Sequence, residues 1–170
     1  MLILFPSHDK GVLVGSNTAW CHPVLYQRIM QAKSQNPDLF VVVVDPRFTS
    51  TCEQADLHLP ILPGQDVALF KGLLQYLYQH GYADHEFVES YTEGLQALLE
   101  ANRTEQDFKA VAKRTGISEE KLQLFFIKLS SVHDKFHRAL VLSGFFFLKI
   151  ASTFLNSSFF PKPIKRRIAI

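Results

Sequence analysis

Three apolar stretches in the first part of the chain have the length and composition of buried strands. Residues 12–14 form a short apolar run that ends at Gly15, and residues 39–44 form a continuous run rich in valine. A β-branched run without polar alternation is typical of a strand covered on both faces. Residues 57–62 form a third extended segment, where Pro60 favours a short or edge strand.

The segments between and after these runs have helical spacing. Pro23 can open a helix at its first turn, and apolar residues at helical intervals continue to about Ser34. Asp66 is a favourable N-cap for a helix that runs to His80 and stops at Gly81. More helices are expected over residues 84–91, 93–101, 104–114 and from 118 onward, with a capping-box pattern at residues 104–107. This order predicts an α/β fold: a partial, open parallel-sheet (Rossmann-like) nucleotide-binding domain, followed by helices.

Three polar turns follow the predicted strands, and they are the main functional signal. They are Gly15-Ser16-Asn17, Asp45-Pro46-Arg47 and Gly64-Gln65-Asp66. In open parallel sheets, ligands bind beyond the carboxyl ends of the strands. We therefore expect the three turns to lie along one edge and to form a nucleotide site there.

The first turn has two interpretations. A glycine at the end of a strand lets a ligand approach the backbone, and the amides and hydroxyl of Ser16 and Asn17 can bind phosphate. Gly, Ser and Asn are also the usual residues of any strand-to-helix turn. Taken alone, this turn favours the ordinary role.

The other two turns carry charge. Asp45, at the tip of a buried strand, can accept both hydroxyls of a ribose, although Asp-Pro is also a common turn. Arg47 adds a partner for phosphate or for ring stacking. Asp66 can accept hydrogen bonds from a purine edge such as the paired N–H groups of guanine, or it can act as a helix cap.

Composition narrows the class of protein. A chain of 170 residues with 47% hydrophobic and 20% charged residues is globular and fits one domain or part of one. Cys21 and Cys52 form no disulfide framework and suit a reducing compartment. The N-terminus lacks the basic region of a signal peptide. A cytoplasmic location is therefore expected. Residues 115–118 resemble a helix-turn-helix turn, but Glu119 and Glu120 would face phosphate, which argues against nucleic acid as a partner.

Residues 128–170 differ from the rest of the chain. Residues 125–170 carry eight Lys and Arg against one acidic residue, and they hold nine of the 15 Phe. Residues 139–160 are long and apolar enough to suggest a membrane span, but Lys149 lies in the middle, so membrane attachment through 139–167 is a minority hypothesis. His133 and His137 are spaced i, i+4, but a bare pair without further ligands is weak evidence for a metal site; a solvated helix face is expected and no metal ligand is assigned.

Three blocks taken together resemble the molybdopterin oxidoreductase family. They are VLVGSNTAWCHPVLYQRI, VVVVDPRFTSTCEQADLHLPILPGQDVAL and VAKRTGISEEKLQLFF, and the likeness is strongest to the catalytic subunit of bacterial assimilatory nitrate reductases. It implies that residues 12–127 are part of an α/β domain that binds molybdopterin guanine dinucleotide. It also implies that Gly15, Ser16 and Asn17 lie near the nucleotide end, Asp45 and Arg47 near the guanosine ribose and phosphates, and Gln65 and Asp66 near the guanine.

The departures from the family pattern limit what is expected of this chain. The iron–sulfur cysteines of the parent enzyme have no counterpart here, and no catalytic residue is assigned. The resemblance implies two-electron reduction of nitrate to nitrite with an external electron donor, but the isolated chain is expected to be inactive. We hypothesise a truncated, frameshifted gene in which residues from about 128 are not family sequence; another reading frame of the neighbouring DNA should then encode a family-like continuation.

Two other functions remain open from the residues alone. One is a stand-alone α/β module that binds a common nucleotide, and it predicts no preference for guanine. The other is a non-enzymatic fragment attached to a membrane through residues 139–167, and it predicts partitioning into detergent.

Overall fold

The computed structural model describes residues 2–7, 10–83, 88, 90, 92–102 and 107–130. Its strands are β1 (Leu2–Ser7), β2 (Lys10–Val14), β3 (Phe40–Val44) and β4 (Leu57–Leu59). Its helices are α1 (Thr18–Cys21), α2 (Pro23–Gln35), the 3₁₀ turn η1 (Ser50–Cys52), α3 (Asp66–Gln79), α5 (Leu95–Ala101), α6 (Phe108–Thr115) and α7 (Glu119–Ser130).

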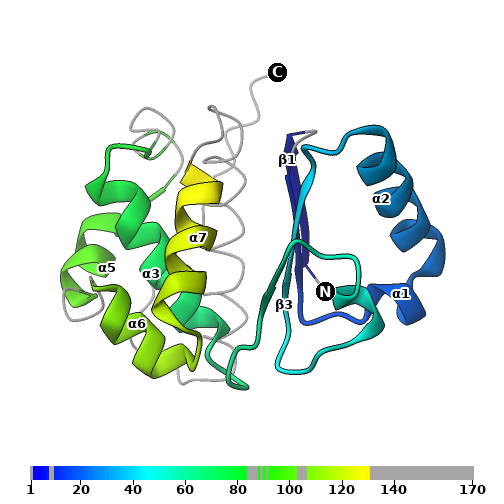
Figure 1. The fold of residues 1–170 in the computed structure, drawn as a ribbon. Helices are drawn as coiled ribbons and strands as arrows, with labels where there is room; N and C mark the ends of the chain where they lie inside the picture. The colour runs from blue at the N-terminus through cyan, green and yellow to red at the C-terminus, as the bar shows by residue number, and fades with distance from the viewer. Residues whose placement is uncertain are drawn as a thin grey trace.

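The strands form one sheet in the order β1-β2-β3-β4 (Figure 1). Strands β2, β3 and β4 are parallel, as the sequence predicted, and Val12 lies opposite Val42, which lies opposite Leu57. Strand β1 was not expected from the sequence; it pairs antiparallel with β2, and its register shifts between Leu4 and Ser7. The fold is therefore α/β, with a parallel three-strand unit and an antiparallel strand on one side.

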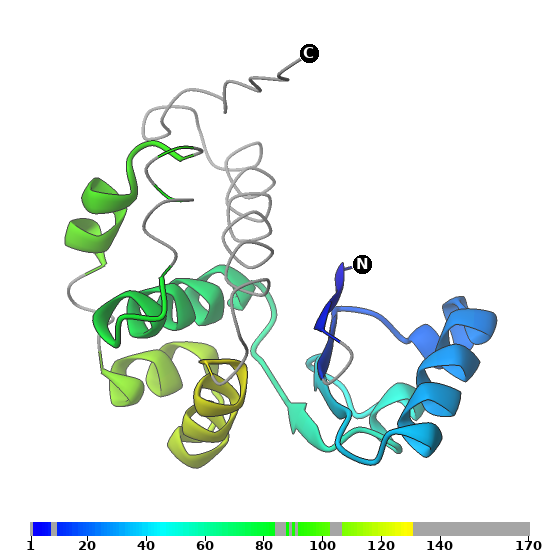
Figure 2. The same cartoon turned by 90° about the horizontal axis from the view of Figure 1, so that it is seen from above.

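Helices cover both faces of the sheet (Figures 1 and 2). Because successive side chains of a strand point to opposite faces, each strand supplies both layers. Val12, Val14, Val42 and Val44 join the cluster formed with α3, α6 and α7. The alternate residues of β2 and β3 pack with Ile29 of α2 in a second, smaller cluster, with Leu13, Leu39, Val41, Val43 and Cys52. The unbroken valine run is explained by this double coverage.

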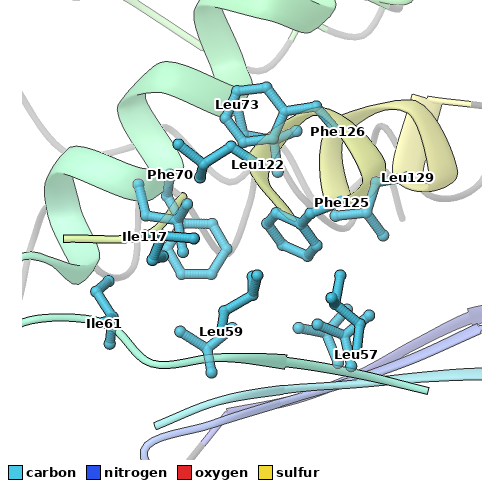
Figure 3. Packing of buried hydrophobic residues seen from close by; sticks show 14 of the residues in the cluster. Leu57, Leu59, Ile61, Phe70, Leu73, Ile117, Leu122, Phe125, Phe126 and Leu129 are labelled. Atoms are coloured by element: carbon cyan, nitrogen blue, oxygen red, sulfur yellow. The ribbon is translucent and has the colours of Figure 1, made fainter. Parts of the chain in front are cut away.

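Within the larger cluster, β4 packs against α7. Figure 3 shows Leu57 and Leu59 directed from the strand toward Phe125 and Leu129 of the helical layer. Phe125 and Leu59 are fully buried. Burial of such side chains contributes about 1.5–3 kcal/mol each, so this contact fixes the helical layer on the sheet.

Most predicted helix bounds agree with the structure to within a few residues. Helix α2 begins at Pro23, and α3 ends before His80 and Gly81. Asp66, however, is the first residue of α3 and Gln65 is its N-cap, so the predicted cap was wrong by one position. Because Asp66 lies in the first turn, its carboxylate still complements the positive end of the helix dipole. Asp107 caps α6 by accepting a hydrogen bond from the backbone of Lys109, so this helix starts later than predicted.

Several predictions concern residues outside the described part of the chain. These are most of the helix over residues 84–91, of which only residues 88 and 90 are described, the contribution of Thr104 to a capping box, the histidine pair at 133 and 137, and the apolar segment 139–167. Within the described ranges, no helix is both long enough and apolar enough to cross a membrane.

Candidate functional site

A shallow groove of about 300 Å³ opens at the carboxyl ends of the parallel strands. Residues from all three polar turns and from the adjacent strand ends line this groove. Its lining is Val14, Gly15, Val44, Pro46, Ile61, Leu62, Pro63, Gly64 and Asp66. Asp66 is the one charged residue of this lining, so the groove is apolar with a single carboxylate. A concave apolar surface with few polar groups is typical of a small-molecule site.

Two glycines leave the backbone of the groove bare. Gly15 has φ 59° and Gly64 has φ 77°, values that other residues adopt only with strain. A Cβ atom added to either would meet nothing within 4 Å. Gly15 also donates its backbone N–H to Val44 O at 2.9 Å, which ties the first turn to the end of β3. A ligand can therefore approach the main chain closely at both turns.

Ser16 and Asn17, the other predicted residues of the first turn, differ in accessibility. Ser16 is 8% exposed, and its Oγ accepts a hydrogen bond from Thr18 Oγ1 at 3.1 Å. Asn17 is half-buried, and its Oδ1 accepts from Thr51 Oγ1 at 3.0 Å. Asn17 is the N-cap of α1, but its side chain makes no capping hydrogen bond. Neither side chain lines the groove directly, although both belong to the turn that does.

The second turn is held by Asp45. Asp45 is 5% exposed, and its Oδ1 accepts the backbone N–H of Arg47 at 2.9 Å. His58 Nε2 lies 2.9 Å from Asp45 O; since a carbonyl can only accept, Nε2 carries the proton. Asp45 N donates to Leu59 O, which fixes the turn to β4. Arg47 is exposed, and it follows Pro46, which lines the groove.

The third turn lines the groove and also contacts a cationic residue of the helical layer. Gln65 Oε1 accepts from Arg114 Nε at 3.4 Å, so this side chain is engaged by α6. Burial, and then the nearby Arg114 guanidinium, lower the pKa of Lys71 below its ordinary value. Asp66 lines the groove and is half-buried. Arg114 therefore brings a positive charge next to Gln65 of the third turn.

The structure brings together more than the sequence predicted. Of the seven predicted residues, Gly15 and Asp66 line the groove, and the other five belong to the turns around it. The sequence analysis did not predict the apolar lining, although the position of these residues at the ends of strands was a signal that could have revealed it. It also missed Thr51 and His58, whose hydrogen bonds hold the turns and could not be found from local pattern. In the described part of the chain, no group of three or more His, Cys, Asp or Glu residues could hold a metal ion.

Comparison with known proteins gives this groove a context. Residues 6–151 match the model of the family described as molybdopterin oxidoreductase. This chain belongs to the molybdopterin oxidoreductase family. The match passes residue 127, the predicted boundary, while the described structure ends at Ser130, so a separate origin for residues 128–170 stays a prediction.

Individual members of the molybdopterin oxidoreductase family are much longer than this chain. It is 46% identical over 120 residues to a nitrate reductase of Shewanella frigidimarina, covering 69% of this chain and 13% of that protein. It is 44% identical over 118 residues to a nitrate reductase of Klebsiella oxytoca, with the same two shares. Among solved structures, acetylene hydratase from Pelobacter acetylenicus aligns with a TM-score of 0.60 and 27% identity, over 74% of this chain and 17% of that one. The chain thus spans about 13% of the length of these curated relatives.

Membership of this family implies a molybdenum–pterin cofactor. One feature of the groove suits an extended part of such a cofactor, namely two glycines in its wall. The backbones of Gly15 and Gly64 face open space that a Cβ atom would enter, and both lie on the wall of the groove. Residues with side chains would close this approach, so the two glycines leave room for a ligand held against the main chain.

Proposed function

We propose that this chain forms one side of the nucleotide end of a molybdopterin guanine dinucleotide site in a nitrate reductase-like enzyme. The observation that supports this proposal most directly is the groove that three strand-end turns border. Family membership supplies the class of cofactor, and the similarity to two nitrate reductases supplies the reaction. The substrate would be nitrate and the product nitrite.

Each turn would have its own part in holding the nucleotide. Gly15 and Gly64 let the ligand approach the main chain. Asp45 keeps Oδ2 as an acceptor for a ribose hydroxyl, because only its Oδ1 is engaged by Arg47 N in the described structure. The exposed Arg47 guanidinium would meet the phosphates.

The third turn would recognise the base. Asp66 is the charged residue of the lining, and its two carboxylate oxygens can accept the two neighbouring N–H groups on the edge of guanine. Adenine lacks that pair of donors on the corresponding edge. Gln65, held by Arg114, would lie beside the base. The proposal therefore predicts selectivity for guanine.

The chain's contribution to the reaction would be binding and orientation. When bound, the cofactor would supply a molybdenum centre for transfer of an oxygen atom from nitrate, with two electrons and two protons converting nitrate to nitrite and water. The two cysteines of this chain cannot provide the four thiolates of an ordinary iron–sulfur cluster. The electrons would have to arrive through groups that these 170 residues do not supply.

A comparison of guanine and adenine nucleotides tests the proposal. Isothermal titration calorimetry of the purified chain should give tighter binding of GDP than of ADP. Asp66→Asn should reduce that preference by about tenfold, because it converts one acceptor into a donor facing a donor. Equal binding of the two nucleotides, or a preference for ADP, would instead support a stand-alone nucleotide-binding module. Fluorescence of the acid-denatured protein would additionally show whether any pterin is retained from the expression host.

A further inference from the structure

Thr51 connects the first turn to the segment that follows the second turn through one buried hydroxyl. It lies in η1, after the second turn, and is 1% exposed. Its Oγ1 accepts the backbone N–H of Ala19 at 3.0 Å and donates to Asn17 Oδ1 at 3.0 Å. Asn17 and Thr51 are 34 positions apart, so the contact joins two separate segments.

These two hydrogen bonds replace the usual arrangement at the start of a helix. An Asn at the N-cap ordinarily accepts a hydrogen bond from the second or third backbone N–H of its own helix. Here the N–H of Ala19, the second residue of α1, is taken by Thr51 instead, and Asn17 makes no side-chain cap. The Asn17 side chain therefore does not form the N-cap hydrogen bond that its position predicts.

The same contacts determine which way the Asn17 amide faces. The N–H of Ala19 can only donate, so Thr51 Oγ1 accepts there and its own proton needs another partner. Because Thr51 is buried, that proton goes to the oxygen of the Asn17 amide and leaves Nδ2 on the other side. Within the described residues, Nδ2 makes no hydrogen bond, and Asn17 is half-buried rather than enclosed.

We propose that Thr51 is a positioning residue that orients Asn17 so that its NH₂ group donates to an acceptor oxygen of the bound nucleotide. This proposal rests on the proposed function, because it assumes a nucleotide at the groove; since Asn17 does not line the groove, the ligand would have to extend past Gly15 along the first turn. The fitting ligand groups are phosphate, ribose or carbonyl oxygens, and groups that can only donate are excluded. Asn17 would then contact the ligand, while Thr51 would act through it.

Isosteric substitutions separate the hydroxyl from the shape of the side chain. Thr51→Val removes both hydrogen bonds at nearly constant volume, and Thr51→Ser keeps the hydroxyl. GDP should bind three- to tenfold more weakly to Thr51→Val, the loss expected for one positioned hydrogen bond, and within twofold of wild type to Thr51→Ser. Amide hydrogen exchange at Ala19, measured by NMR without ligand, should accelerate in Thr51→Val and stay unchanged in Thr51→Ser.

Two further variants test whether the effect passes through Asn17. In an Asn17→Ala background, Thr51→Val should change the GDP dissociation constant by less than twofold, since contacting residues are not additive. Asn17→Asp keeps an acceptor for Thr51 but removes the donor, so it should preserve exchange protection at Ala19 and still weaken GDP binding by at least threefold. This variant leaves Thr51 intact and serves even if Thr51→Val does not fold.

The outcomes distinguish this inference from the proposed function. If the wild-type chain does not bind GDP, the proposed function fails, and the ligand-directed role of Thr51 fails with it. If the wild type binds GDP and Thr51→Val binds it equally well, the proposed function stands and the positioning role is wrong. Additive effects of Thr51→Val and Asn17→Ala would likewise show a purely structural residue.

Discussion

Three glycines with similar backbone conformation allow the role of the groove to be tested against a matched control. Gly15, Gly64 and Gly81 have φ values of 59°, 77° and 72°, and an added Cβ atom meets nothing within 4 Å at any of them. Gly15 and Gly64 line the groove, whereas Gly81 follows α3 and does not. Substitution by alanine therefore imposes a similar backbone strain at three places but adds a methyl group to the lining of the groove at only two.

The expected change in stability is small and shared. A left-handed conformation costs an L-residue roughly 1–2 kcal/mol, and the reduced freedom of the unfolded chain offsets about 0.4–1 kcal/mol of that. Each alanine variant should therefore lose about 1 kcal/mol of unfolding free energy. For a chain of this size that corresponds to a fall in Tm of about 2–4 °C, measured by circular dichroism.

The expected change in ligand binding is not shared. Gly15→Ala and Gly64→Ala place a methyl group where the ligand would approach the main chain, so GDP affinity should fall by about tenfold, or about 1.4 kcal/mol. Gly81→Ala should bind GDP like the wild type. The reasoning is refuted if all three variants lose GDP affinity equally, because strain alone would then explain the loss, or if Gly15→Ala and Gly64→Ala bind normally.

Three further predictions concern packing, charge and activity. Gly72→Ala brings a Cβ atom to 2.7 Å from Val111 Cγ2, and the overpacking cost of about 1–3 kcal/mol should exceed the roughly 1 kcal/mol gain in helix propensity. Urea unfolding should show that Gly72→Ala lowers the unfolding free energy by about 1 kcal/mol. This loss should be smaller when Gly72→Ala is made in a Val111→Ala background, and the exposed Gln79→Ala should not show it. A stabilised Gly72→Ala would contradict this. Lys71→Gln should stabilise the protein at pH 7, because burial and Arg114 lower the pKa of Lys71, so the folded state binds its proton less tightly than the unfolded state. That advantage should disappear as the pH rises toward the ordinary lysine value of 10.5, and an equal advantage at pH 7 and above 10.5 would contradict the electrostatic origin. The purified chain should produce no nitrite from nitrate with reduced methyl viologen, and measurable turnover would overturn the expectation that it needs the rest of the enzyme.

The strands could be predicted where local pattern decides the structure. The valine run of β3 has few alternatives, because β-branched residues without polar alternation favour a strand covered on both faces. Strand β1 was missed because Pro6 interrupts a short apolar run, and its extended form depends on pairing with β2. Pro6 is tolerated there because β1 is an edge strand of the sheet.

The candidate site could be predicted in outline for a different reason. The carboxyl ends of parallel strands share one edge, so turns such as Gly15-Ser16-Asn17 could be placed together from chain order alone. The partners of each side chain could not, since they lie far away in sequence. Thr51 reaches Asn17 across 34 positions, and Gln65 meets Arg114 across 49. Asp66 was misplaced by one residue because Asp is a preferred N-cap and Gln is not, whereas the structure has Gln65 at the N-cap without a side-chain capping hydrogen bond.

The order of strands in the sheet bears on how the chain folds during synthesis. Each strand pairs with the one that precedes it in the sequence, so the sheet can grow as the chain leaves the ribosome. Helix α2 can cover one face early and α3 can begin to cover the other, but the cluster on that second face is completed only with Phe125 and Leu129 of α7. At 5–20 residues per second, roughly four to fourteen seconds separate the synthesis of β4 from that of α7. During that interval the second apolar face is only partly covered, and exposed apolar surface of this kind makes a nascent chain prone to aggregation and a target for chaperones.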